Sequence, residues 1–165
     1  MTGMNAPMDP APRTVVNAGK LWAGGAATAA VAALIAVVGI LFGRGLFDID
    51  VLAPKGEGTW GDASTGWYAF GAGVAALLAT GLVHALIVTT PRPMRFFGWV
   101  VGLSTVAAML APFVTDASLG ARLYTAGLNL VLGIAIGSLV AGVARSSTSQ
   151  VVPRPAPRPY PRPYG

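Results

Sequence analysis

Few side chains in this 165-residue sequence could do acid–base, nucleophilic or metal chemistry. The chain has one histidine, His84, one glutamate, Glu57, and no cysteine. Without cysteine there is no thiol nucleophile, disulfide or thiolate zinc site. Catalytic and metal sites need several such groups converging on one place. We therefore expect no enzyme activity, no metal site and no bound cofactor.

Two enzyme patterns can be formed from the remaining residues, and both are set aside. The run Gly102-Leu103-Ser104-Thr105 fits the G-x-S-x pattern of rhomboid-type intramembrane proteases, with His84 as the base. A serine nucleophile also needs oxyanion donors, and none accompanies this run. A haem held by two histidines would need His84 from two chains.

The residues around His84 belong to long apolar segments. Of the whole chain 54% is hydrophobic and only 10% charged, whereas soluble domains carry about 25% charged residues. Four nearly uncharged runs stand out, and each is close to the roughly 20 residues that a helix needs to cross a bilayer. They cover residues 21–42, 67–89, 96–114 and 123–144.

The positive charges between these runs predict their orientation. Eight Lys and Arg residues fall on the side of the two termini, and three fall on the other side. Basic residues that flank membrane helices stay cytoplasmic, so both termini are predicted inside, in a plasma-membrane protein. The eight are Arg13, Lys20, Arg92, Arg95, Arg145, Arg154, Arg158 and Arg162.

The predicted fold is all-α: a polytopic membrane protein with an up-down bundle of four transmembrane helices. The transmembrane domain covers residues 20–145, with one sizeable outer loop at 43–66. Residues 1–19 and 146–165 are predicted to be disordered cytoplasmic tails, because proline-rich segments without apolar periodicity form no packed core.

Four polar residues, one on each helix, are predicted to lie at similar depth. Helical rise places His84 in the cytoplasmic third of the membrane, level with the other three. Facing inward, they would form one hydrogen-bonded layer. Such a layer could be a proton- or ligand-responsive site, since histidine titrates near neutral pH; the alternative is a neutral histidine that tightens the bundle. The four are Thr28, His84, Ser104 and Ser138.

Asn129 is predicted to have a structural partner. Pro112 has no N–H, so it leaves the carbonyl of Ala108, four residues earlier, without its helical donor. Ala108 and Asn129 fall at nearly the same depth. The side-chain amide of Asn129 is therefore expected to bond this carbonyl.

Glycine pairs at four-residue spacing predict helix contacts. Small residues let helices approach closely in lipid, and at least two of three such pairs are expected at contacts. The pairs are Gly39 with Gly43, Gly98 with Gly102, and Gly133 with Gly137.

The outer loop and the C-terminal tail have patterns of their own. Residues 47–51 alternate apolar and acidic, as in a short strand. The pair Asp48 and Asp50 offers too few oxygens for a Ca²⁺ or Mg²⁺ site, so a solvated loop is expected there. The tail repeats a proline–arginine unit that favours polyproline II. It could dock a cytoplasmic partner, contact anionic lipid or stay solvated; its candidate contact residues are Arg154, Arg158, Tyr160, Arg162 and Tyr164.

Several short segments carry a resemblance to a family. These are residues 21–25, 51–54, 89–93, 96–99, 129–131 and 137–140. Over residues 20 to 145 the chain resembles an uncharacterised family of small four-helix membrane proteins common in actinobacteria. The resemblance implies location and topology, and it supplies no activity or functional residues.

The sequence thus predicts an integral membrane protein that acts as a non-enzymatic accessory or scaffold subunit. Its partners would be the lipid bilayer and a membrane or cytoplasmic protein reached through the tail. The alternative is a small homo-oligomeric transporter or channel built around His84. Nucleic acid is not implied, because the arginines flank membrane segments or lie in the tail instead of forming a basic folded face.

Overall fold

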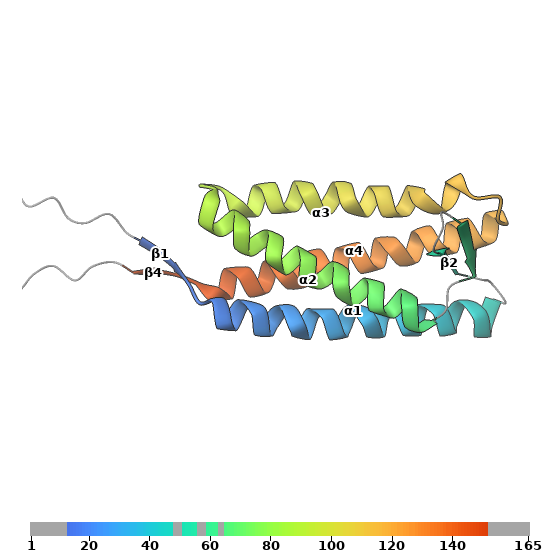
Figure 1. The fold of residues 1–165 in the computed structure, drawn as a ribbon, viewed down its shortest axis with the longest axis horizontal. Coiled ribbons are helices and arrows are strands. Elements are labelled where there is room, and N and C mark those ends of the chain that lie inside the picture. The colour runs from blue at the N-terminus through green and yellow to red at the C-terminus, as the bar shows by residue number, and fades with distance from the viewer. Residues whose placement is uncertain (1–12, 48–50, 56–58, 63–64, 152–165) are drawn as a thin grey trace, which may run out of the picture.

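A computed structural model describes residues 13–47, 51–55, 59–62 and 65–151. It confirms four helices long and apolar enough to cross a membrane. These are α1 (Ala18–Phe47), α2 (Thr65–Thr89), α3 (Pro93–Leu110) and α4 (Leu119–Ser147), with a 3₁₀ turn, η1 (Ala111–Val114), after α3. Figure 1 shows them as an elongated up-and-down bundle.

Polar residues next to the apolar runs start two of these helices. The backbone N–H of Lys20 donates to the Asn17 side chain (2.9 Å), and that of Ala121 donates to the Ser118 hydroxyl (3.3 Å). Such caps satisfy N–H groups that the first helical turn leaves unpaired. As a result α1 and α4 begin before the apolar runs from which they were predicted.

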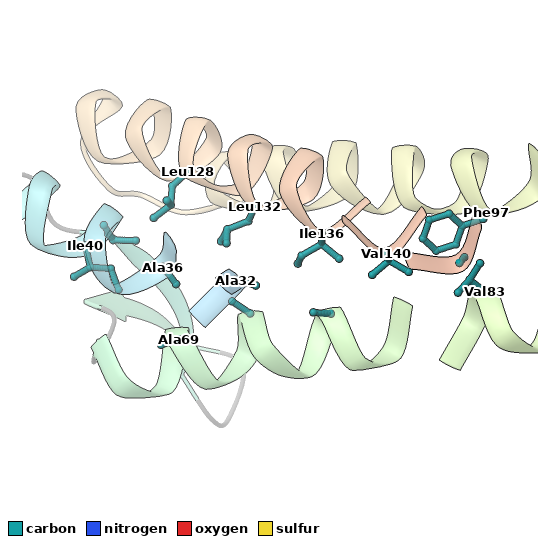
Figure 2. Packing of buried hydrophobic residues seen from close by; sticks show 14 of the residues in the cluster. Ala32, Ala36, Ile40, Ala69, Val83, Phe97, Leu128, Leu132, Ile136 and Val140 are labelled. Carbon is teal, nitrogen blue, oxygen red and sulfur yellow. The ribbon is translucent and has the colours of Figure 1, made fainter. Parts of the chain in front are cut away.

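Helices α2 and α4 each contact the other three helices of the bundle, and α4 supplies a row of large core side chains. Leu128, Leu132, Ile136 and Val140 recur every four residues, so they share one face of α4, and all are buried. Figure 2 shows them as a row, with small side chains such as Ala32 and Ala69 opposite. Large residues on α4 and alanines on α1 and α2 together form an apolar core.

The two segments that flank the bundle pair with each other. Strand β1 (Arg13–Val16) is antiparallel to β4 (Thr148–Val151), with Val16 opposite Thr148. The expectation of disordered tails is therefore wrong for these residues; residues 1–12 and 152–165 lie outside the described part. Each strand is only four residues long, too short to give a clear alternating pattern in the sequence.

A second strand pair lies at the opposite end of the bundle (Figure 1). Strands β2 (Leu52–Lys55) and β3 (Thr59–Asp62) are antiparallel. The strand predicted for residues 47–51 is displaced, because α1 continues to Phe47 and Val51 precedes β2; residues 48–50 are not described. Gly43, the first residue of the added turn, faces the Tyr124 ring of α4, and the Tyr124 hydroxyl donates to the Gly39 carbonyl one turn earlier (2.7 Å).

Candidate functional site

The predicted polar layer is not assembled. Thr28 is buried and donates to Gly24 of its own helix (2.9 Å), and exposed Ser138 donates to Ala135 (3.2 Å). Among the described residues, no hydrogen bond links any two of Thr28, His84, Ser104 and Ser138. Equal depth does not bring these side chains together, because residues at one depth can point in different directions around their helix axes.

His84 instead pairs with a tryptophan of α1. The indole N–H of Trp22 donates to His84 Nδ1 at 3.3 Å, and the two rings meet edge to face with centroids 6.4 Å apart. To accept this bond Nδ1 must carry no proton. Trp22 is 44% exposed, so the pair lies at the outer surface of α1 and α2 and not in the core.

The predicted bond between Asn129 and Ala108 is confirmed. The Asn129 amide nitrogen donates to the Ala108 carbonyl at 2.7 Å, which joins α4 to α3. No sequence pattern indicated the third member of this network: Tyr68 of α2 donates its hydroxyl to Asn129 Oδ1 at 2.5 Å. Three helices are therefore linked by one small polar network.

Two of the three glycine pairs lie at helix contacts. Gly39 and Gly43 face Leu128 and Tyr124 of α4, while Gly133 and Gly137 face Thr105 and Val101 of α3. The pair Gly98 and Gly102 is not at a close helix contact within the described residues, because a Cβ added at either glycine would meet no atom within 4 Å. They lie one position beyond Phe97 and Val101, which face the bundle, and one residue rotates the position by about 100° around the helix.

Helix α1 makes two further close approaches that no sequence pattern predicted. A Cβ on Gly25 would lie 2.5 Å from Thr80 Cγ2 of α2. Gly24 meets Val143 of α4 in the same way. These adjacent glycines let one turn of α1 pack against two helices. They are neighbours in sequence, so they do not form a pair of small residues at the four-residue spacing that predicts helix contacts.

A cleft of about 680 Å³ opens between α2, α3 and α4. Tyr68 and Asn129 lie at the cleft together with Ala108, and Ser104 and Thr105 line the α3 wall. The other lining residues are apolar: Trp67, Gly71, Ala72, Ala75, Leu78, Ala79, Leu82, Val100, Val101, Leu132, Gly133 and Ile136. Described polar groups and open space therefore coincide in this cleft.

The described residues form neither a protease dyad nor a metal centre. Ser104 lines the cleft, whereas His84 is bonded to Trp22 and does not line it. Within the described ranges no group of three His, Asp or Glu side chains could hold a metal ion. The candidate tail residues 154–164 lie outside these ranges.

Comparison with known proteins places the chain in a family without giving it an activity. No curated protein and no solved structure matches it. A family of unknown function, DUF6069, matches residues 16–146, which includes nearly all of the four helices. The match covers most of the chain, and the protein belongs to this family.

Proposed function

We propose that the protein is a non-enzymatic accessory or scaffold subunit of a plasma-membrane assembly. The observation that supports this proposal is the low burial of α3. Only 11% of its span is buried within the chain, compared with 22–28% for the other three. Much of its circumference is therefore available to another membrane protein.

The exposed face of α3 has features that suit helix–helix contact. Gly98 and Gly102 lie on it with open space around them, beside the exposed Trp99, Leu103 and Val106. In lipid, apolar area alone does not drive association, so close backbone approach and shape complementarity must supply it. Two glycines flanked by large side chains provide a groove and ridges for a partner helix.

The transporter alternative receives little support from the described side chains. Most buried residues of the bundle are apolar, and the buried Thr28 and Thr80 donate to carbonyls of their own helices. Within the described residues, Thr28, His84, Ser104 and Ser138 form no connected layer. A pathway for ions or polar solutes needs lining groups that replace the hydration shell. The bundle core offers alanine, leucine and isoleucine instead.

The tail supplies a second contact in the proposal. The excess of Lys and Arg on the side of the termini favours cytoplasmic termini. Arg154, Arg158 and Arg162 alternate with prolines, a composition suited to an aromatic groove on a cytoplasmic protein. The tail would then connect the membrane assembly to a cytoplasmic component.

The test is purification of the tagged protein from its native membrane, followed by native mass spectrometry. We expect one foreign membrane subunit at fixed stoichiometry. It should be lost in Gly102→Leu, which fills the α3 groove, and kept in Ala85→Leu, which places the same side chain at an exposed site on α2. Deletion of residues 152–165 spares β4 and should remove only a cytoplasmic partner.

Two results would contradict the proposal. One is a particle that contains this chain alone, as a monomer or homo-oligomer, from the native membrane. The other is a foreign subunit that both Gly102→Leu and the tail deletion retain, since association would then use neither surface.

A further inference from the structure

We propose that the cleft between α2, α3 and α4 binds one neutral lipid. Its hydrocarbon chain would lie along the cleft, and its uncharged polar end would meet Tyr68 and Asn129. This inference goes beyond the accessory role and does not depend on it, since it concerns a different face of the protein.

The dimensions of the cleft fit a chain molecule. Its α2 wall runs from Trp67 to Leu82, which is about 22 Å at 1.5 Å per residue. The volume of about 680 Å³ lies within the roughly 300–1,000 Å³ typical of ligand sites. A helix about 11 Å across would occupy about 2,000 Å³ over that length, so the cleft could take up only part of a partner helix.

Small side chains create this space. Gly71, Ala75 and Ala79 recur every four residues along the α2 wall, and a Cβ on Gly71 would meet nothing within 4 Å. Elsewhere in the bundle small residues bring helices into contact, as Gly25 does against Thr80. Here they leave an open apolar groove on the membrane-spanning surface, where empty space forfeits dispersion contacts and hydrocarbon restores them.

The polar groups at the cleft select an uncharged end. None of its lining residues is charged, so a charged headgroup would find no counter-charge there. Asn129 uses one amide hydrogen on Ala108 and accepts from Tyr68. Its second amide hydrogen makes no bond to any described residue. An ester or quinone carbonyl would accept from this donor.

Ser104 provides an independent second contact. Thr80 and Thr105 each donate back to a carbonyl of their own helix, and Thr28 and Ser138 do the same. Ser104 lines the cleft, yet its hydroxyl makes no hydrogen bond within the described residues. It lies about 6 Å along the α3 axis from Ala108. A second carbonyl on the polar end would reach it.

The test uses the purified full-length protein in nanodiscs, with a photoactivatable diacylglycerol that carries a diazirine in one acyl chain. We expect crosslinks on the lining residues of α2, α3 and α4. Unlabelled diacylglycerol or a long-chain quinone should compete, and the stronger competitor identifies the polar end. Ala75→Leu and Ser104→Leu fill the cleft from opposite walls, and each should reduce labelling at least five-fold. The matched control Ala85→Leu should leave labelling unchanged.

The thermal unfolding temperature of each variant shows whether reduced labelling comes from a filled cleft or from a damaged fold. Two cleft-filling variants are used so that the test still holds if one of them fails to fold. Labelling spread evenly over exposed residues of α1, such as Leu34 and Val38, without competition would overturn the proposal, because the probe would then report bulk lipid. If the anionic lipid phosphatidylglycerol competed as well as the neutral competitors, the inference that the bound polar end is uncharged would be overturned. Labelling retained in both folded, cleft-filled variants would overturn the site itself.

Discussion

The side-chain amide of Asn129 on α4 lies 2.7 Å from the carbonyl oxygen of Ala108 on α3. That carbonyl has lost its usual helical donor, because Pro112, four residues later, has no N–H. The proline ends α3 and η1 follows, while Asn129 supplies the missing hydrogen bond from a neighbouring helix. A break in one helix thereby fixes its position relative to the next.

Asn129→Leu should destabilise the protein by about 1–3 kcal/mol, because it removes two hydrogen bonds from the membrane interior. Leucine has nearly the same shape as asparagine, so the loss of unfolding free energy measures the polar network and not a cavity. Reversible unfolding in bicelles measures the free energy.

Tyr68→Phe is the matched control, because it removes only the bond to Asn129 Oδ1. Alone it should cost about 0.5–1.5 kcal/mol. In the Asn129→Leu background it should cost much less, since the acceptor is already gone. Additive losses in the double variant would show that the two residues act independently.

Gly133→Ala and Gly102→Ala should behave oppositely. A methyl group on Gly133 would lie 2.8 Å from Thr105 Cβ, and Thr105 is fixed by its bond to Val101 (2.8 Å). Overpacking of this kind costs about 1–3 kcal/mol. Gly102 has open space, so alanine there should be neutral or gain up to about 1 kcal/mol of helix propensity. Equal effects on the unfolding free energy would contradict this packing.

Thr125→Val should loosen the β2–β3 pair. The Thr125 hydroxyl accepts from the buried backbone N–H of Leu52 at 3.1 Å. Valine keeps the volume but leaves that N–H unpaired, at a cost of about 1–3 kcal/mol. Hydrogen exchange at the Leu52 amide should accelerate in the valine variant and stay slow in Thr125→Ser. Unchanged exchange in both would mean that the strand pair holds without α4.

His84→Phe should change the unfolding free energy by less than about 1 kcal/mol, because its bond to Trp22 lies near the surface. Proton flux into reconstituted vesicles should equal that of protein-free vesicles, with or without the substitution. A proton flux that depends on pH and disappears in the His84→Phe variant would support the transporter alternative.

Much of the fold could be predicted because it follows from one-dimensional properties. Apolar length and flanking charge are enough to locate four spans. The bond between Asn129 and Ala108 could be predicted because the two residues lie at similar depth and Pro112 has no N–H for the Ala108 carbonyl. Both arguments use position along the chain and nothing about rotation around a helix.

The rest could not be predicted, because it depends on rotation and on contacts between distant segments. Thr28 and Ser104 fall at similar depth but face different surroundings, so the predicted polar layer does not form. Tyr68 reaches Asn129 only because α2 turns that face toward α4. The paired residues of strands β1 and β4 are at least 132 positions apart in sequence, as for Val16 and Thr148, and nothing local to either strand indicates its partner.

The β1–β4 pair has a practical consequence for rearranging the chain. Arg13 lies opposite Val151, and facing Cα atoms in such a ladder are about 5 Å apart. A short peptide could therefore join the two strand ends, with new termini opened between α2 and α3 near Pro91. Circular permutation is tolerated where the original ends are adjacent and the new ones are exposed. The order of the helices along the polypeptide could then change while their neighbours in space stay the same.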